Sequence, residues 1–316
     1  MKAYRAPKRT GVIAMIEISS ERVGHVAYRL IKHASIELPP DVETALKAAY
    51  KRESNPNGKA FFKSILKNLE IAKQKRIPIC QDTGIPIYYI SIGSNVVVKG
   101  SLREAIDEAT RRATLETPLR PQVTHPLTFE NTGNNTGWGI PPIYYDRIEG
   151  GDYIDILAVP RGGGAESKWQ CVALYHAAPR EKAIMKTVLD TVSMAGGECC
   201  PPTIIGVGLG GFGREYSEVL ARKAIFRSPL NSRHPDPRVA ELEERLYRAV
   251  NQMKIGPLGI GGDTSCIGLH IELAGGHSAS CSVAVALSCW AARYSRARIY
   301  GNDSVDFITH PQLKEK

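Results

Sequence analysis

The chain has 316 residues, of which 43% are hydrophobic and 23% charged, a composition typical of a soluble globular protein. No apolar run approaches the roughly 20 residues that cross a bilayer, and no signal peptide is recognisable, so we expect a cytoplasmic protein without a membrane partner. The formal net charge is +9, but the basic residues are scattered without interleaved aromatics, so we expect no nucleic-acid partner.

The apolar spacing predicts a largely helical portion at residues 18–75, followed by a portion at residues 76–295 in which strands and helices alternate. A capping box at Ser101–Glu104 predicts a helix that runs to about Glu116. Another helix is expected to begin at Pro179 and stop at Gly196. Further helices are expected at 215–226 and 237–253, and strands at 85–92, 153–159, 203–207, 267–273 and 281–287. We therefore expect an α/β fold, with mixed sheets surrounded by helices, in one domain covering residues 1–316.

Glycines gather at the joints between these elements, at residues 162–164, 206–213, 259–262 and 275–276. Glycine lets the backbone approach a ligand closely, so these clusters predict a site built from several converging loops. Residues 206–211 also match the G-x-G-x-x-G pattern of dinucleotide-binding proteins. A nicotinamide-dependent oxidoreductase is therefore one hypothesis, although a tight strand-to-helix turn explains the pattern equally well.

Cys80-Gln81-Asp82-Thr83-Gly84 combines a thiol, an amide, a carboxylate and a hydroxyl, a mixture that indicates a reactive centre for a polar small molecule. The seven cysteines are odd in number and include no Cys-x-x-Cys pair, which argues against a disulfide framework or a zinc ribbon. We expect Cys171, Cys266 and Cys281 to be small buried hydrophobic residues. Four cysteines remain. Cys80, Cys200 and Cys289 each lie where an element is expected to begin or end, and Cys199 is adjacent to Cys200. Thiolates suit iron–sulfur clusters, and three of them on a cubane leave one iron without a protein ligand.

Six motifs occur in the order found in the iron–sulfur hydro-lyases, and the chain resembles that family over residues 80–293. They are Cys80–Gly84, Asn131–Thr136, Gly162–Gly164, Cys200–Pro202, Gly256–Gly259, and His277 twelve residues before Cys289. The resemblance implies a [4Fe-4S] cluster held by Cys80, Cys200 and Cys289, with Cys199 as the alternative second ligand. It also implies substrate contacts from Gln81, Arg120 and the backbone of Gly163, and catalytic roles for Asp82 and His277.

The family contains class I fumarases and L(+)-tartrate dehydratases, so the resemblance implies reversible hydration of a small dicarboxylate. We expect fumarate and malate to be the substrates, with L(+)-tartrate as the alternative. Tartrate is favoured by three segments, Asn135–Gly139, Ser232–Pro235 and Cys289–Ala291.

The chain stops at Lys316, whereas single-chain fumarases continue into a portion that carries the presumed base. The resemblance therefore implies an α subunit that works with a separate β subunit, as a heterotetramer. A more remote alternative is an iron–sulfur electron-transfer or sensor protein, which would need Cys199 or Cys266 as a fourth ligand.

Overall fold

The computed structural model describes residues 15–175 and 180–313, so the helix start predicted at Pro179 lies outside the described residues. The helices are α1 Ser20–Ile36, α2 Pro40–Arg52, α3 Pro56–Lys75, α4 Leu102–Glu116, α5 Gly163–Glu166, α6 Arg180–Ala195, α7 Arg214–Ile225 and α8 Pro237–Gln252. The strands are β1 Ile16–Ser19, β2 Ile85–Gly93, β3 Val96–Lys99, β4 Ile143–Ile148, β5 Tyr153–Arg161, β6 Gln170–Tyr175, β7 Thr203–Gly211, β8 Cys266–Gly276, β9 Ser280–Leu287, β10 Ser295–Tyr300 and β11 Val305–Phe307. The mixed α/β class predicted from the sequence is confirmed.

Local capping explains where several of these helices begin. The Ser101 hydroxyl accepts the Glu104 N–H at 3.2 Å and starts α4, as the capping box predicted. The Asn55 side chain likewise accepts the Gly58 N–H at 3.1 Å at the start of α3. None of the helices in the described part of the chain combines the length and apolar character that a membrane crossing requires.

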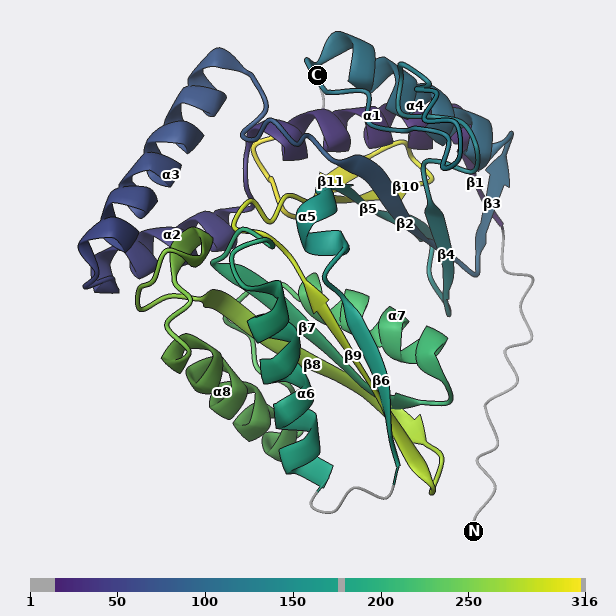
Figure 1. Cartoon of the computed structure of the whole chain (residues 1–316). Helices are drawn as coiled ribbons and strands as arrows, with labels where there is room; N and C mark the ends of the chain where they lie inside the picture. Colours follow the sequence, from purple (N-terminus) through teal and green to yellow (C-terminus); the bar gives the residue numbers. More distant parts are fainter. Residues whose placement is uncertain (1–14, 176–179, 314–316) are drawn as a thin grey trace.

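Two sheets dominate the molecule and lie one above the other in Figure 1. The upper sheet has the strand order β11-β10-β5-β2-β4, and the lower sheet has the order β6-β9-β7-β8. Both are mixed, because β2 pairs with β4 and β7 pairs with β8 in parallel, whereas the other neighbours are antiparallel. The short strands β1 and β3 form a separate parallel pair.

The hydrophobic core has separate parts that follow these layers. Helices α1 and α4 cover the five-stranded sheet, and α6 and α8 cover one face of the four-stranded sheet, with α7 on its other face. Helices α2 and α3 contribute a further core that includes Val159 from β5 and Ile204 from β7. This third core therefore joins the two sheets, and the loops that carry the cysteines lie beside it.

The G-x-G-x-x-G segment lies inside β7, and its glycines let α7 pack closely on the strand. A Cβ atom at Gly206 would lie 2.2 Å from the Ala221 carbonyl oxygen, and one at Gly208 would lie 1.9 Å from the Ser217 carbonyl oxygen. Close helix packing accounts for these glycines, so the motif gives no ground for a nicotinamide-binding turn.

We expect Gly208→Ala to lower the free energy of unfolding by about 1–3 kcal/mol, because the added methyl group pushes α7 away from β7. Urea denaturation followed by far-UV circular dichroism measures the change. Gly275→Ala is the control, since a Cβ there meets nothing within 4 Å and the change should stay within about 0.5 kcal/mol. Equal stability of the two variants would contradict this account of the motif.

Candidate active site

Three loops bring Cys80, Cys200 and Cys289 to the junction between the two sheets. Cys80 lies between α3 and β2, Cys200 between α6 and β7, and Cys289 between β9 and β10. The Trp290 N–H donates to the carbonyl oxygen of Cys200 at 2.9 Å, which ties the second loop to the third. Arg293 Nη1 donates to the carbonyl oxygen of Asp82 at 2.8 Å, which ties the third loop to the first.

The three thiols interact electrostatically. Burial raises the pKa of Cys200, and the neighbouring thiols of Cys289 and Cys80 raise it further. Burial likewise raises the pKa of Cys289, against the opposing effect of the Arg293 and Arg161 guanidiniums. All three cysteines are partly exposed, so a ligand placed between them would be reachable from solvent.

The donor set fits an iron–sulfur cluster better than a single metal ion. Within residues 15–175 and 180–313, no three His, Cys, Asp or Glu side chains surround a point that would hold one ion. A cubane offers a separate iron to each thiolate, so its ligands do not have to meet at one atom. Three neighbouring soft thiols with guanidiniums beside them are suited to an anionic cluster of this kind.

The environments of Cys199 and Cys200 differ. Cys199 is 2% exposed, its thiol donates to the Gly196 carbonyl oxygen at 3.5 Å, and burial raises its pKa to about 11. Cys200 is partly exposed and interacts electrostatically with Cys80 and Cys289, which favours it as the second ligand.

The other cysteines lie in the sheets. Cys171 and Cys266 are buried as predicted, and Asn251 Nδ2 lies 3.5 Å from the Cys266 sulfur. Cys281 is only half-buried, so the prediction of full burial is wrong for it. The reason is its place near the start of β9, where the hairpin reaches the surface of the molecule.

Asp82 joins the first cysteine motif to the glycine loop at residues 162–164. Its Oδ1 accepts the Gly84 N–H at 3.0 Å, and its Oδ2 accepts the Gly163 N–H at 3.0 Å. A Cβ atom at Gly162 would lie 2.9 Å from that Oδ2, so glycine is needed for the approach. The N–H that the resemblance assigns to the substrate is thus directed at the Asp82 carboxylate.

The backbone of Arg120 is held on both sides, whereas its side chain is exposed. The Thr83 hydroxyl accepts the Arg120 N–H at 2.9 Å, and Asn135 Nδ2 donates to the Arg120 carbonyl oxygen at 2.9 Å. Asn135 is fully buried and also accepts the Gln122 N–H at 2.7 Å. In the described part of the chain the Arg120 guanidinium has no carboxylate partner, so it is available to an anionic ligand.

His277 lies away from the three cysteines within this chain. It occupies the turn between β8 and β9, whereas Cys289 follows the opposite end of β9 (Figure 1). The eight residues of β9 separate the two ends by about 26 Å at roughly 3.3 Å per residue. The histidine ring is exposed, with its centroid 6.0 Å from that of Phe212. Its catalytic role stays a prediction that needs a second chain to bring it to the site.

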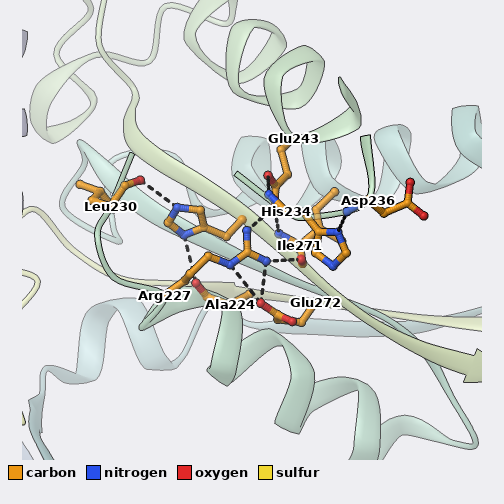
Figure 2. A network of polar contacts seen from close by, with 9 residues as sticks. Ala224, Arg227, Leu230, His234, Asp236, Glu243, Ile271 and Glu272 are labelled. Atoms are coloured by element: carbon orange, nitrogen blue, oxygen red, sulfur yellow. Dashed lines mark hydrogen bonds and ion pairs between the residues drawn. The ribbon is translucent and has the colours of Figure 1, made fainter. Parts of the chain in front are cut away.

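The Ser232–Pro235 segment, which favoured tartrate in the sequence, belongs to a network of polar contacts between the loop before α8 and strand β8 (Figure 2). The His234 N–H donates to the fully buried Glu243 carboxylate at 3.1 Å, and Arg227 pairs with the same carboxylate at 2.6 Å. Arg227 also pairs with Glu272 at 2.6 Å. These contacts give the segment a structural role.

Sequence reasoning missed Gln122, Arg161 and Arg293 as residues that build the site. Their contacts join segments far apart in the chain: Arg161 Nη2 donates to the carbonyl oxygen of Leu287 at 2.9 Å. Asn135 belongs to the Asn131–Thr136 motif, but its hydrogen bond to the Arg120 carbonyl oxygen was not predicted.

Comparisons with known proteins agree with this architecture. The family described as fumarate hydratase (Fumerase) matches residues 25–298, a range that includes all three cysteines. A putative L(+)-tartrate dehydratase subunit alpha from Methanocaldococcus jannaschii is 39% identical over 281 residues, covering 88% of this chain and 98% of that protein. The L(+)-tartrate dehydratase subunit alpha of Escherichia coli strain K12 is 34% identical over 276 residues, covering 87% and 90%. The chain therefore belongs to the fumarate hydratase family and is an enzyme of the hydro-lyase class.

Proposed function

We propose that this chain is the α subunit of a dehydratase that acts on a small hydroxy-dicarboxylate, with L(+)-tartrate as the preferred substrate. The observation that carries the proposal is the similarity, over nearly the whole length of both chains, to two proteins named as L(+)-tartrate dehydratase α subunits. The sequence analysis placed fumarate and malate first. The names of these relatives favour the alternative, whereas the matching family model is described as fumarate hydratase.

The proposed site divides the chemistry among residues that the structure brings together. When bound to Cys80, Cys200 and Cys289, a [4Fe-4S] cluster would supply a Lewis-acidic iron for the hydroxyl group that leaves as water. The exposed guanidinium of Arg120 grips a substrate carboxylate through two parallel hydrogen bonds. Negative charge develops on the carboxylate next to the carbon that loses its proton, so this grip tightens in the transition state. Gln81, exposed beside Cys80, orients a substrate oxygen.

Asp82 acts by holding the loops in position. Both of its carboxylate oxygens accept backbone N–H groups, from Gly84 and Gly163, which fixes the glycine loop against the first cysteine motif. The base that removes the carbon-bound proton is therefore assigned to the β subunit. His277 can contribute only from a second chain, and loss of turnover with intact cluster content in His277→Ala would support that role.

The substrate assignment is tested with the α chain purified anaerobically with its β subunit and reconstituted with iron and sulfide. Dehydration of malate gives fumarate, followed by its ultraviolet absorbance; dehydration of tartrate gives oxaloacetate, followed by coupled NADH oxidation. We expect kcat/KM for L(+)-tartrate to exceed that for malate. The reverse order would restore fumarate and malate as the substrates, and no turnover of either acid by the cluster-loaded complex would refute both substrate assignments.

The β subunit is proposed to dock on the segment between α4 and β4, which also carries Arg120 and Asn135. Leu127, Phe129 and Trp138 are 84%, 78% and 51% exposed there. Grouped, exposed large apolar side chains mark protein–protein contact surfaces. Docking on this segment would place the β subunit beside the residues that contact the substrate.

We expect Phe129→Asp to weaken the α–β complex by roughly tenfold or more, because a buried aromatic anchor is replaced by a desolvated charge. The left-handed backbone at this position, with φ of 60°, tolerates aspartate. Sedimentation velocity at several concentrations measures the affinity. Met194→Asp is the control, since Met194 is 65% exposed but lies on α6. Unchanged affinity in Phe129→Asp would place the interface elsewhere.

A further inference from the structure

Arg293 occupies a central position among the loops of the site that no catalytic role explains. It follows Cys289 by four residues and is only 3% exposed. Its Nη1 donates to the Asp82 carbonyl oxygen at 2.8 Å, and its Nη2 lies 3.5 Å from the place that a Cβ atom of Gly162 would occupy. The guanidinium therefore touches the first cysteine motif and the glycine loop, and its own chain segment carries the third cysteine.

No described carboxylate forms an ion pair with this guanidinium, because the nearby carboxylate of Asp82 accepts the backbone N–H groups of Gly84 and Gly163 instead. No described acidic side chain lies within 4.0 Å of it, and its Nε is buried without a hydrogen-bond partner. The other arginines buried near these sheets differ: Arg161 pairs with Glu166 at 2.7 Å, and Arg227 pairs with Glu243 and Glu272. A buried charge without a partner is strongly unfavourable, so such a residue is expected to face an anion.

Water cannot replace that anion. A small cavity of about 20 Å³ beside Arg293 and Cys289 has room for about one water molecule. A water there can accept a hydrogen bond from Nε but carries no charge. Cys289 lines the same cavity as Arg293, and the loops of Cys80 and Cys200 are tied to this loop by hydrogen bonds, so an anionic cluster on the three cysteines would lie beside the guanidinium.

We propose that Arg293 is the buried counter-cation of the iron–sulfur centre, a positioning residue whose charge is balanced only when the three thiolates hold the anionic cluster. This inference rests on the proposed cluster. It has an unusual consequence, because the same side chain should destabilise the chain without the cluster and stabilise the cluster once it is bound.

The test compares Arg293→Met with the unaltered full-length chain, each prepared without the cluster and after anaerobic reconstitution with iron and sulfide. Without the cluster, Arg293→Met is expected to unfold at a higher temperature than the unaltered chain. After reconstitution, its cluster is expected to be lost on exposure to air at least several-fold faster, followed by visible absorbance and iron content, and to have a lower reduction potential. Arg293→Lys, which keeps the charge, is expected to recover most of the cluster lifetime.

Arg227→Met is the control for a buried arginine that is already paired, and it is expected to unfold at a lower temperature without the cluster. The inference is overturned if Arg293→Met without the cluster is destabilised as much as Arg227→Met, or if its cluster has the lifetime and potential of the unaltered chain. Failure of the unaltered chain itself to hold a [4Fe-4S] cluster would instead refute the proposed cofactor, so the two failures are distinguishable.

Discussion

Replacing Cys289 by serine is expected to abolish cluster retention and, with it, dehydratase activity. Serine offers a hard hydroxyl in place of a soft thiolate, so one of the three proposed iron ligands is lost. Loss of a partner behind a metal ligand typically costs 10–100-fold in affinity, so loss of the ligand itself should cost roughly 100-fold or more. Iron and acid-labile sulfide per chain, visible absorbance and turnover measure the effect after identical reconstitution.

Cys171→Ser provides the matched control, because the same chemical change is made at a buried cysteine in β6. The Cys171 sulfur lies 3.9 Å from the Arg214 carbonyl oxygen, on the strand and away from the three cysteine loops. We expect this variant to lose about 1 kcal/mol of stability and to keep its cluster. A Cys289→Ser chain that retains cluster and activity would refute the ligand assignment.

Arg120→Met is expected to lower kcat/KM by roughly a thousandfold, since two charge-assisted hydrogen bonds to the substrate carboxylate are worth about 4 kcal/mol together. Most of the loss should fall on kcat, because charge on that carboxylate is greatest in the transition state. Steady-state kinetics of the cluster-loaded α–β complex give both parameters.

Cluster content and thermal stability should be unchanged in Arg120→Met, because the side chain is exposed and only its backbone is held, by Thr83 and Asn135. Arg111→Met is the comparison at another exposed arginine: Arg111 lies on α4 and pairs with Glu108 at 2.6 Å. Equal activity of the two variants would remove Arg120 from the substrate site.

The fold could be predicted where local patterns are strong. Helices α1 to α3 were predicted from the apolar spacing of residues 18–75, and α4 from the Ser101 capping box. The longer apolar runs predicted β2, β5, β7, β8 and β9. The short strands β1 and β3 carry too few residues for a pattern, and β4 is largely exposed. Strand β10 was predictable in principle, because the sequence Ser-Arg-Ala-Arg-Ile-Tyr places the small or apolar residues at every second position, and these are the buried ones.

The site was predictable only in part, because most of it depends on contacts between distant segments. The three cysteine loops stood out through their residue types and the family resemblance. Asn135 and Arg293 act through hydrogen bonds to the backbone of segments that are remote in sequence. The periodicity of a sequence does not predict contacts of this kind. The glycines of β7 suggested a dinucleotide-binding site that the structure does not support. Close helix packing and dinucleotide binding both require glycine, so the sequence pattern alone does not distinguish them.

The position of the cysteine loops at the junction of the sheets also sets the order of events during synthesis. The three proposed ligands are spread so widely that Cys289 leaves the ribosome more than two hundred residues after Cys80. The third loop reaches the second only after β9 has paired between β6 and β7. A nascent chain that still lacks β9 contains the sequence of helices α1 to α8 but not the third cysteine loop. Binding of the proposed cluster to all three cysteines therefore has to follow the synthesis of β9.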